Sequence, residues 1–294
     1  IRLRSRDCLR AAFQQTDRRI VMTEVRYQYL RPRQIIERRK ACPVAYVPIG
    51  TLEWHGYHNP LGADTLQAEG FAIACAERGG GLAFPPLYYG ENRLQSLMEA
   101  NSSDRDAIAK AMELDPKNFE PSAFPFSETD QMLAYNHLLL HILGELETLG
   151  FKLGVIVAGH YPLISHAQSA VLMHNRRSQT GRPNRMLAWA FLDYLFLQGR
   201  YDCAGDHAAG WETSHLMALH PQTVDLSELP ARGEPLVGVG GKMAPQDATA
   251  AFGQETIDAT VEIALKEVDH RLKNTELYFK HGAALKEGLW RSAT

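Results

Sequence analysis

The sequence contains few cysteines, no long hydrophobic run and neither of the common nucleotide-binding motifs. Its four cysteines among 294 residues are scattered without a C-x-x-C pair, which argues against a thiolate zinc site. No window of about 18 uncharged apolar residues occurs, so no transmembrane helix is expected. The first residues lack the apolar core of a secretory signal. We therefore predict a cytoplasmic protein whose thiols stay reduced.

A glycine-rich segment at residues 237–242, Val-Gly-Val-Gly-Gly-Lys, comes nearest to a phosphate-binding loop. It lacks both the spacing of G-x-x-x-x-G-K-[ST] and the Ser or Thr that follows the lysine. No G-x-G-x-x-G follows Gly199 either. A nucleotide cofactor is therefore not expected.

Charge is distributed unevenly along the chain. The hydrophobic content of 45 % and charged content of 22 % are typical of a folded protein. The net charge of −3 divides into +8 for residues 1–40 and −11 for residues 41–294. A basic extension of this kind is either a nucleic-acid tail or a segment that packs on an acidic neighbouring surface or subunit. The extension lacks interleaved aromatics, so we favour the second interpretation and expect neither nucleic acid nor a membrane as a partner.

Alternating strand and helix patterns predict an α/β fold. Short apolar runs indicate buried strands at residues 44–49, 82–84, 153–157 and 186–192. Helical spacing indicates helices at about 65–78, 130–149 (with Thr129 or Asp130 as the N-cap), 165–177 and 246–272. This order predicts a mainly parallel sheet covered by helices on both faces. No linker or internal repeat divides the chain, which favours one domain.

A polar, proline-containing insert at about residues 91–129 interrupts this alternation, with a short helix near 105–114. Long connections of this kind often serve as lids or substrate loops.

The first group of chemically active residues follows the first strand. Glu53 and His55 are two positions apart, so on an extended segment their side chains point the same way. Asp64 stands at the expected start of a helix, where it is either an N-cap or a metal ligand. Carboxylate and imidazole together suit Zn, Mn or Fe rather than Mg or Ca.

Two further groups follow later in the chain. His160 comes directly after the strand at 153–157, at the kind of strand end where ligands bind in parallel sheets. His207 and Glu212 are separated by mostly small residues, and a helix is expected to begin at Thr213 or Ser214. The structural alternative is a loop followed by a capped helix.

His137 and His141 are four residues apart on one expected helix, as in a zincin motif. Leu138 occupies the position of the zincin glutamate, so the H-E-x-x-H chemistry is absent. We interpret both histidines as helix-packing residues or as residues that support a site indirectly.

Four motifs occur in the same order as in a known family. P-x-G-[ST]-x-E-x-H-G lies at residues 48–56, P-L-x-x-D at 60–64, A-G-H at 158–160 and H-A-x-x-x-E-T-S at 207–214. Over roughly residues 43–270 the chain resembles the creatininase (creatinine amidohydrolase) family. The resemblance implies a three-layer αβα sandwich with a mainly parallel central sheet, formed by residues 41–294, and assembly as a homo-oligomer, often a hexamer.

The resemblance also implies a metal site with one or two ions of Zn, Mn or Fe. By motif position, Glu53 and His160 would hold one ion and His55 the other, with Asp64 bridging them. His207 matches the family's acid/base position.

The chain departs from creatininase itself at Pro162, where that enzyme has a glutamate that completes the second metal. Glu212, which we count among the catalytic residues, would replace this ligand; the alternatives are a water ligand or a single ion. Tyr161, Arg93 and Trp211 are the candidate substrate contacts.

The predicted function is a metal-dependent hydrolase that opens a small, polar, cyclic substrate. The expected target is an amide or lactam C–N bond, attacked by a metal-bound hydroxide. One alternative is C–C hydrolysis of a cyclic diketone such as 3-dehydro-scyllo-inosose in inositol catabolism. Another is a maturation factor that trims or binds a peptide. The insert replaces a shorter family segment, so we expect a substrate other than creatinine.

Overall fold

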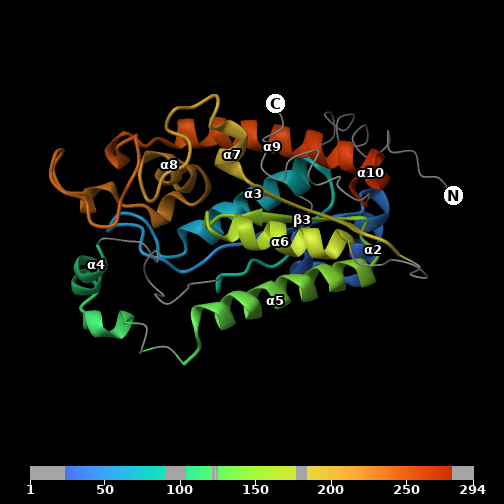
Figure 1. The fold of residues 1–294 in the computed structure, drawn as a ribbon. Coiled ribbons are helices and arrows are strands. Elements are labelled where there is room, and N and C mark those ends of the chain that lie inside the picture. The colour runs from blue at the N-terminus through green and yellow to red at the C-terminus, as the bar shows by residue number, and fades with distance from the viewer. Residues whose placement is uncertain (1–23, 91–103, 121–122, 124, 177–183, 280–294) are drawn as a thin grey trace.

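The centre of the molecule is a four-stranded parallel sheet (Figure 1). The computed structural model describes residues 24–90, 104–120, 123, 125–176 and 184–279. In spatial order the strands are β2 (Leu82–Ala83), β1 (Val44–Ile49), β3 (Leu153–Ala158) and β4 (Leu187–Leu192). Val44 lies opposite Leu153 and Ile49 opposite Ala158, so β1 and β3 end level with each other. The predicted parallel sheet is therefore confirmed.

Helices cover both faces of this sheet. One layer contains α3 (Ala63–Gly79), α8 (Gly210–Leu219) and α9 (Ala250–Lys273), and the other contains α5 (Glu128–Thr148) and α6 (Leu163–Arg176). Tyr46 and Val155 pack in the core on the α3 and α9 side, whereas Val47 and Ile156 pack against α5 and α6. Figure 1 shows α9 and α5 on opposite sides of the sheet. This alternation confirms the three-layer αβα sandwich.

Shorter elements complete the described chain. They are α2 (Pro32–Ala41), α4 (Arg105–Ala111), α7 (Asp193–Leu197), α10 (Thr275–Phe279) and the 3-10 turns η1 (Tyr27–Tyr29), η2 (Pro116–Phe119), η4 (Pro221–Thr223), η5 (Leu226–Glu228) and η6 (Pro245–Asp247). The helix expected inside the insert is present as α4.

The segment before β1 packs on the sandwich. Val25 is buried in the core of the α3 layer, and its carbonyl oxygen accepts a hydrogen bond from the Ala83 amide at 3.0 Å. Val25 therefore packs with the core of the sandwich. Residues 1–23 of the predicted extension lie outside the described residues.

Two helices begin earlier than the sequence predicted. Helix α5 begins at Glu128, because Ser127 is its N-cap and exchanges hydrogen bonds with Asp130 in a capping box. Helix α8 begins at Gly210 rather than at Thr213 or Ser214. In α8 the amides of the first turn bind a carboxylate from the preceding loop, described below, which local spacing did not reveal.

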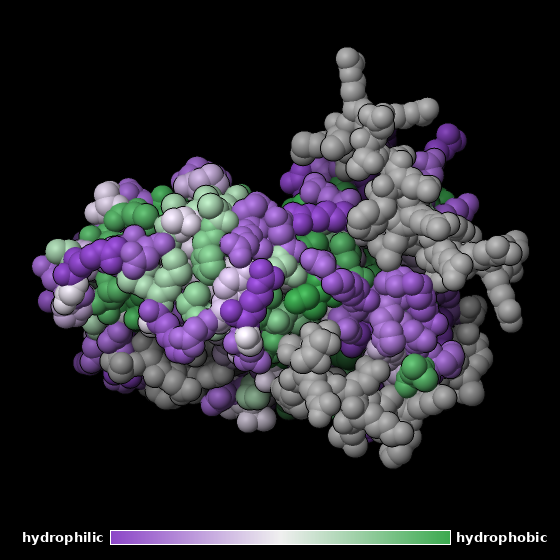
Figure 2. All heavy atoms as spheres, turned by 90° about the horizontal axis from the view of Figure 1, so that it is seen from above, coloured by the Kyte–Doolittle hydropathy of each residue, from purple (hydrophilic) through white to green (hydrophobic). Residues whose placement is uncertain are grey.

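The outer layer has a polar surface over α9. Asp258 and Glu262 are exposed, while Ile257 and Val261 on the opposite side of the helix are buried. Viewed from above, hydrophilic residues cover much of this face, with hydrophobic residues between them (Figure 2). Among the described residues, no helix has both the length and the hydropathy required to span a bilayer.

Candidate metal centre

Five side chains meet where β1 and β3 end. Glu53 and His55 lie in the loop at residues 50–62 that follows β1, and Asp64 is the second residue of α3. His160 comes two residues after β3, and Glu212 is the third residue of α8. Neighbouring parallel strands bring their carboxyl ends to one edge of the sheet, so the groups converge although they are distant in sequence.

The end of β3 lies directly against the first turn of α3. A side chain at Gly159 would overlap the carbonyl oxygen of Asp64, so this approach requires glycine. The N-cap of α3 is Gly62, which makes no side-chain capping bond. The alternative that Asp64 caps this helix is therefore wrong, and its carboxylate points to two histidines instead.

The five groups form two sets that share Asp64. In the first set, Nδ1 of His160 lies 3.0 Å from Oε2 of Glu53 and 3.1 Å from Oδ2 of Asp64. In the second, Nε2 of His55 lies 3.1 Å from Oδ1 of Asp64 and 3.5 Å from Oε2 of Glu212. Each oxygen of Asp64 thus serves one set, and the atoms of each set lie within 4.8 Å of one another.

The carboxylates of this cluster are buried with few hydrogen-bond donors. Glu53 and Asp64 are each 2 % exposed; Oε1 of Glu53 accepts no hydrogen bond from the described residues, and Oε2 of Glu53 and Oδ2 of Asp64 share the single Nδ1 of His160. Burying a carboxylate without donors is costly, and a cation removes this cost. Carboxylate and imidazole groups also match the preferences of Zn, Mn and Fe. The donor set therefore fits two divalent transition-metal ions.

The electrostatics of the cluster agree with this arrangement. Burial alone would lower the pKa of His55, but the carboxylates of Asp64, Glu212 and Glu53 outweigh it and raise the pKa to about 10. Burial would raise the pKa of Asp64, but His55 and His160 hold it well below its usual range. Without cations, protons on the histidines would balance the buried negative charge, so metal ions and protons compete for these positions.

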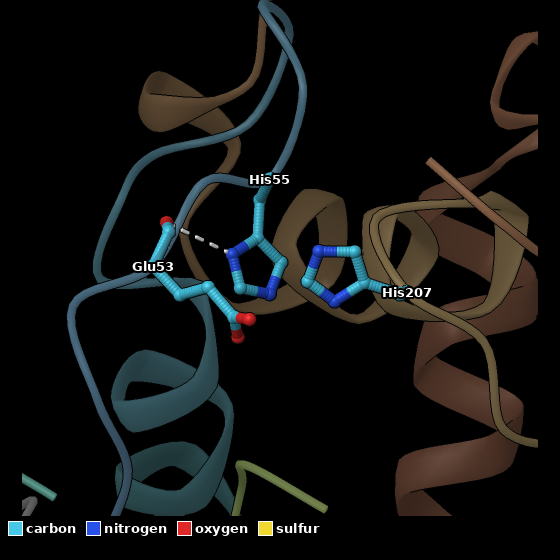
Figure 3. A group of neighbouring side chains, drawn as sticks. All are labelled: Glu53, His55 and His207. Carbon is cyan, nitrogen blue, oxygen red and sulfur yellow. Dashed lines mark hydrogen bonds between the residues drawn. The ribbon is translucent and has the colours of Figure 1, made fainter. Parts of the chain in front are cut away.

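Hydrogen bonds to backbone carbonyls orient two imidazole rings. Nδ1–H of His55 donates to the carbonyl oxygen of Glu53 at 3.1 Å (Figure 3). This bond leaves Nε2 of His55 facing Oδ1 of Asp64 at 3.1 Å. Nε2–H of His207 donates to the carbonyl oxygen of Trp54 at 2.9 Å. The two rings lie side by side, with centroids 4.6 Å apart, next to the Glu53 carboxylate. A ring nitrogen of His207 therefore lies within reach of the same ligand positions.

Glu212 reaches the cluster because of a bent loop before α8. We did not single out Asp206 from the sequence as part of the site. Its carboxylate accepts hydrogen bonds from the amides of Trp211 and Glu212, and this stabilises the start of α8 at Gly210. Ala208 adopts a φ of 57°, and its amide donates to Oε2 of Glu212 at 2.8 Å.

His58 holds this loop from the opposite side. Its Nε2–H donates to the carbonyl oxygen of Ala208 at 2.9 Å, and burial lowers the pKa of His58 to about 4. In the sequence His58 lies between the motifs at residues 48–56 and 60–64, and we did not single it out.

Of the three predicted substrate contacts, one lies beside the candidate metal centre, one is packed in the core and one is outside the described residues. The hydroxyl of Tyr161 accepts a hydrogen bond from the Asp206 amide at 3.0 Å, beside the loop that carries His207. Trp211 is fully buried, and its indole N–H donates to Asp193 at 2.9 Å, which favours a packing role over substrate contact. Arg93 lies outside the described residues.

His137 and His141 belong to neither ligand set. Both are exposed on α5, which differs from the predicted packing role, and His141 forms an ion pair with Glu145 at 3.3 Å.

The buried carboxylate–imidazole cluster at the strand ends of this αβα sandwich has the ligand types that bind the metal ions of hydrolytic enzymes. Comparison with known proteins narrows the class. The family model of creatininase, described as creatinine amidohydrolase, matches residues 28–268. The chain therefore belongs to the creatininase family and is a hydrolytic enzyme of the metal-dependent amidohydrolase class.

Individual relatives agree with this assignment. Creatinine amidohydrolase of Pseudomonas putida is 25 % identical over 197 residues, which cover 63 % of this chain and 68 % of that protein. A 3-dehydro-scyllo-inosose hydrolase of Thermotoga maritima is 35 % identical over 68 residues, 23 % of this chain and 22 % of that protein.

Solved creatininase structures share the fold at low sequence identity. A crystal structure of creatinine amidohydrolase has a TM-score of 0.61 at 20 % identity and covers 85 % of this chain and 98 % of its own. A structure named as creatininase with manganese has a TM-score of 0.62 at 20 % identity, covering 85 % and 99 %. A mutant named as the Zn–Zn type also has a TM-score of 0.62 at 20 % identity, covering 85 % and 98 %.

Proposed function

We propose that this enzyme uses two divalent transition-metal ions to open a small, polar, cyclic substrate at an amide or lactam C–N bond. The observation that carries the proposal is the position of Asp64, whose two oxygens each face a different histidine at 3.1 Å. A carboxylate shared between two ligand sets is what a bridged pair of cations requires.

Each set would hold one ion. Glu53 and His160 would bind the first, His55 and Glu212 the second, and Asp64 would bridge them. Zn, Mn or Fe suits this donor set, and the relatives named for zinc and manganese support that range. When bound, such ions supply an acidified water as nucleophile and stabilise negative charge that develops on the substrate carbonyl oxygen.

His207 is the proposed proton donor to the leaving nitrogen. A carbonyl oxygen only accepts hydrogen bonds, so the contact with the Trp54 carbonyl requires a proton on Nε2 of His207. Proton exchange with the substrate then falls to Nδ1. An imidazole can both take up and release a proton, so Nδ1 would have to gain a proton before it passes one to the leaving nitrogen.

A second candidate is hydrolysis of a C–C bond in a cyclic diketone. The local identity of 35 % to the Thermotoga maritima 3-dehydro-scyllo-inosose hydrolase favours it. The same cations and the same proton donor would serve either reaction, with carbon rather than nitrogen as the protonated atom.

A substrate screen separates the candidates. Protein loaded with Zn, Mn or Fe is tested against cyclic amides, cyclic keto-polyols and short peptides, with chelator-stripped protein as the control. We expect turnover of a cyclic amide only after loading. Turnover of a keto-polyol alone would establish the second candidate, and peptide cleavage alone would favour a maturation role. A protein that accepts no metal under any loading condition would contradict all three.

The number of ions depends on Glu212, because Pro162 provides no side-chain ligand where creatininase has its glutamate. We expect Glu212→Gln to lower the metal content from two ions per chain to one, measured by elemental analysis after dialysis. Glu147→Gln is the matched control, since Glu147 is also 2 % exposed but belongs to neither set. Retention of two ions by Glu212→Gln would assign the second position to other ligands.

A further inference from the structure

Beside the metal centre, the described residues form a third apolar core, separate from the two that cover the sheet. Its buried members are Trp54, Ile108, Ala109 and Phe119, with Leu61, Ala111, Met112, Leu114 and Val237 packed against them. They come from three segments: the loop at residues 50–62, the insert at residues 104–119 and the loop around Val237. Figure 1 shows α4 of the insert standing apart from the layers of the sandwich. The insert thus packs on the loop that carries Glu53 and His55, rather than on the main cores.

Trp54 joins the three segments. Its indole ring packs with Ile108 of α4, and its Nε1–H donates to the carbonyl oxygen of Val237 at 2.8 Å. The carboxylate of Asp104, the N-cap residue of α4, accepts a hydrogen bond from the Gly238 amide at 2.7 Å. Gly238 has a φ of +60°, and a Cβ there would lie 2.7 Å from the Trp54 ring. The fit leaves little room for independent movement of the segments.

His207 forms hydrogen bonds with two of these segments, the loop at residues 50–62 and the loop that follows Val237. The backbone carbonyl of Trp54 accepts the Nε2–H of the His207 ring at 2.9 Å. The His207 amide donates to the Gly240 carbonyl at 2.7 Å, and the Gly240 amide donates back at 2.9 Å. Both the ring and the backbone of His207 are therefore held by residues adjacent to the third core.

We propose that residues 104–119 of the insert are a positioning element for His207: Ile108 and Asp104 fix Trp54 and Gly238, which in turn set the orientation and tautomer of the His207 ring. The inference rests on the proposed role of His207. It gives the insert a function in addition to that of a lid or substrate loop. The carbonyl of Trp54 selects the Nε2-protonated tautomer, because it accepts hydrogen bonds and cannot donate them. Displacement of this carbonyl would tilt the ring or release it into both tautomers.

Truncation of Ile108, which the insert contributes to the third apolar core, tests the proposal. Ile108→Ala removes buried atoms that pack against Trp54 without touching the ligand sets. We expect kcat to fall by about 10-fold or more, because a misplacement near 1 Å costs up to about 100-fold, with KM and metal content little changed. Ile108→Val should recover most of the loss. Ile257→Ala, at a comparably buried position in a sheet core, is the control and should change kcat far less.

A spectroscopic readout separates failure of this inference from failure of the proposed function. In the zinc-loaded full chain with 15N-labelled histidine, the His207 signals are identified by their loss in His207→Asn. We expect one Nε2-protonated tautomer in the wild type and a mixture in Ile108→Ala. Trp54→Phe, which keeps an aromatic ring but loses the bond to Val237, should shift the same signals if Ile108→Ala fails to fold.

Unchanged His207 signals in the insert variants would overturn the proposal whether or not a substrate has been found. So would a rise in KM with kcat unchanged, since it would show that the insert acts only on substrate binding. Absence of turnover for every substrate, with the tautomer still responding to Ile108→Ala, would instead refute the proposed function and leave the positioning contact intact.

Discussion

Replacement of Asp64 by alanine is expected to abolish binding of both ions and to remove hydrolytic activity while the fold persists. Asp64 places one carboxylate oxygen 3.1 Å from His55 and the other 3.1 Å from His160. Changes to residues that only support a metal ligand cost about 10–100-fold, so loss of a bridging ligand should exceed that range. Elemental analysis measures the ions, steady-state kinetics the turnover, and circular dichroism the fold.

The fold should survive because the substitution removes one of three buried carboxylates that repel one another when no cation is bound. Burial and the nearby Asp64 and Asp206 carboxylates already raise the pKa of Glu212 well above its usual range, although His55 partly offsets them. Asp225→Ala, at an exposed position outside the ligand sets, is the control and should retain both ions. Asp64→Ala protein that keeps two ions and full turnover would contradict the bridged arrangement.

His207→Ala is expected to lower kcat by about 10²–10⁴-fold, the range for loss of a general acid or base. Its ring is held beside His55 and Glu53 by the Trp54 carbonyl, where it can pass a proton to a leaving group. The comparison is made at saturating substrate with fully loaded protein, so that binding and metal content do not mask the chemical step.

Metal content then identifies the role of this histidine. If His207 transfers protons, the alanine variant keeps both ions; if it is a ligand in the group with Glu53 and His55, one ion is lost. His270→Ala, on the exposed side of α9, is the matched control and should retain both turnover and ions. Unchanged kcat in His207→Ala would remove the residue from the reaction.

Much of the architecture and part of the site could be predicted from local sequence. Buried strands in a parallel sheet are short apolar runs, and the four predicted runs correspond to β1, β2, β3 and β4. Glu53 and His55 stand in the motif that follows β1, Asp64 stands in the next motif along the chain, and His160 stands beside the end of β3. The close grouping of these four residues follows from the level ends of β1 and β3.

The tertiary structure alone decided which groups complete the cluster and what holds them. Glu212 joins His55 because Asp206 begins α8 at Gly210, and the choice of a helix start by a carboxylate several residues away is not visible in local spacing. Trp211 beside it points into the core instead of toward a ligand.

The contact between Trp54 and His207 likewise joins residues 153 positions apart. A sequence pattern records which residues can pack or ionise, whereas hydrogen bonds between distant loops depend on how the whole chain folds back on itself. The candidate ligand types and the strand ends were therefore determined by the sequence, whereas the second candidate ligand set and the contacts that hold His207 were decided by the tertiary structure.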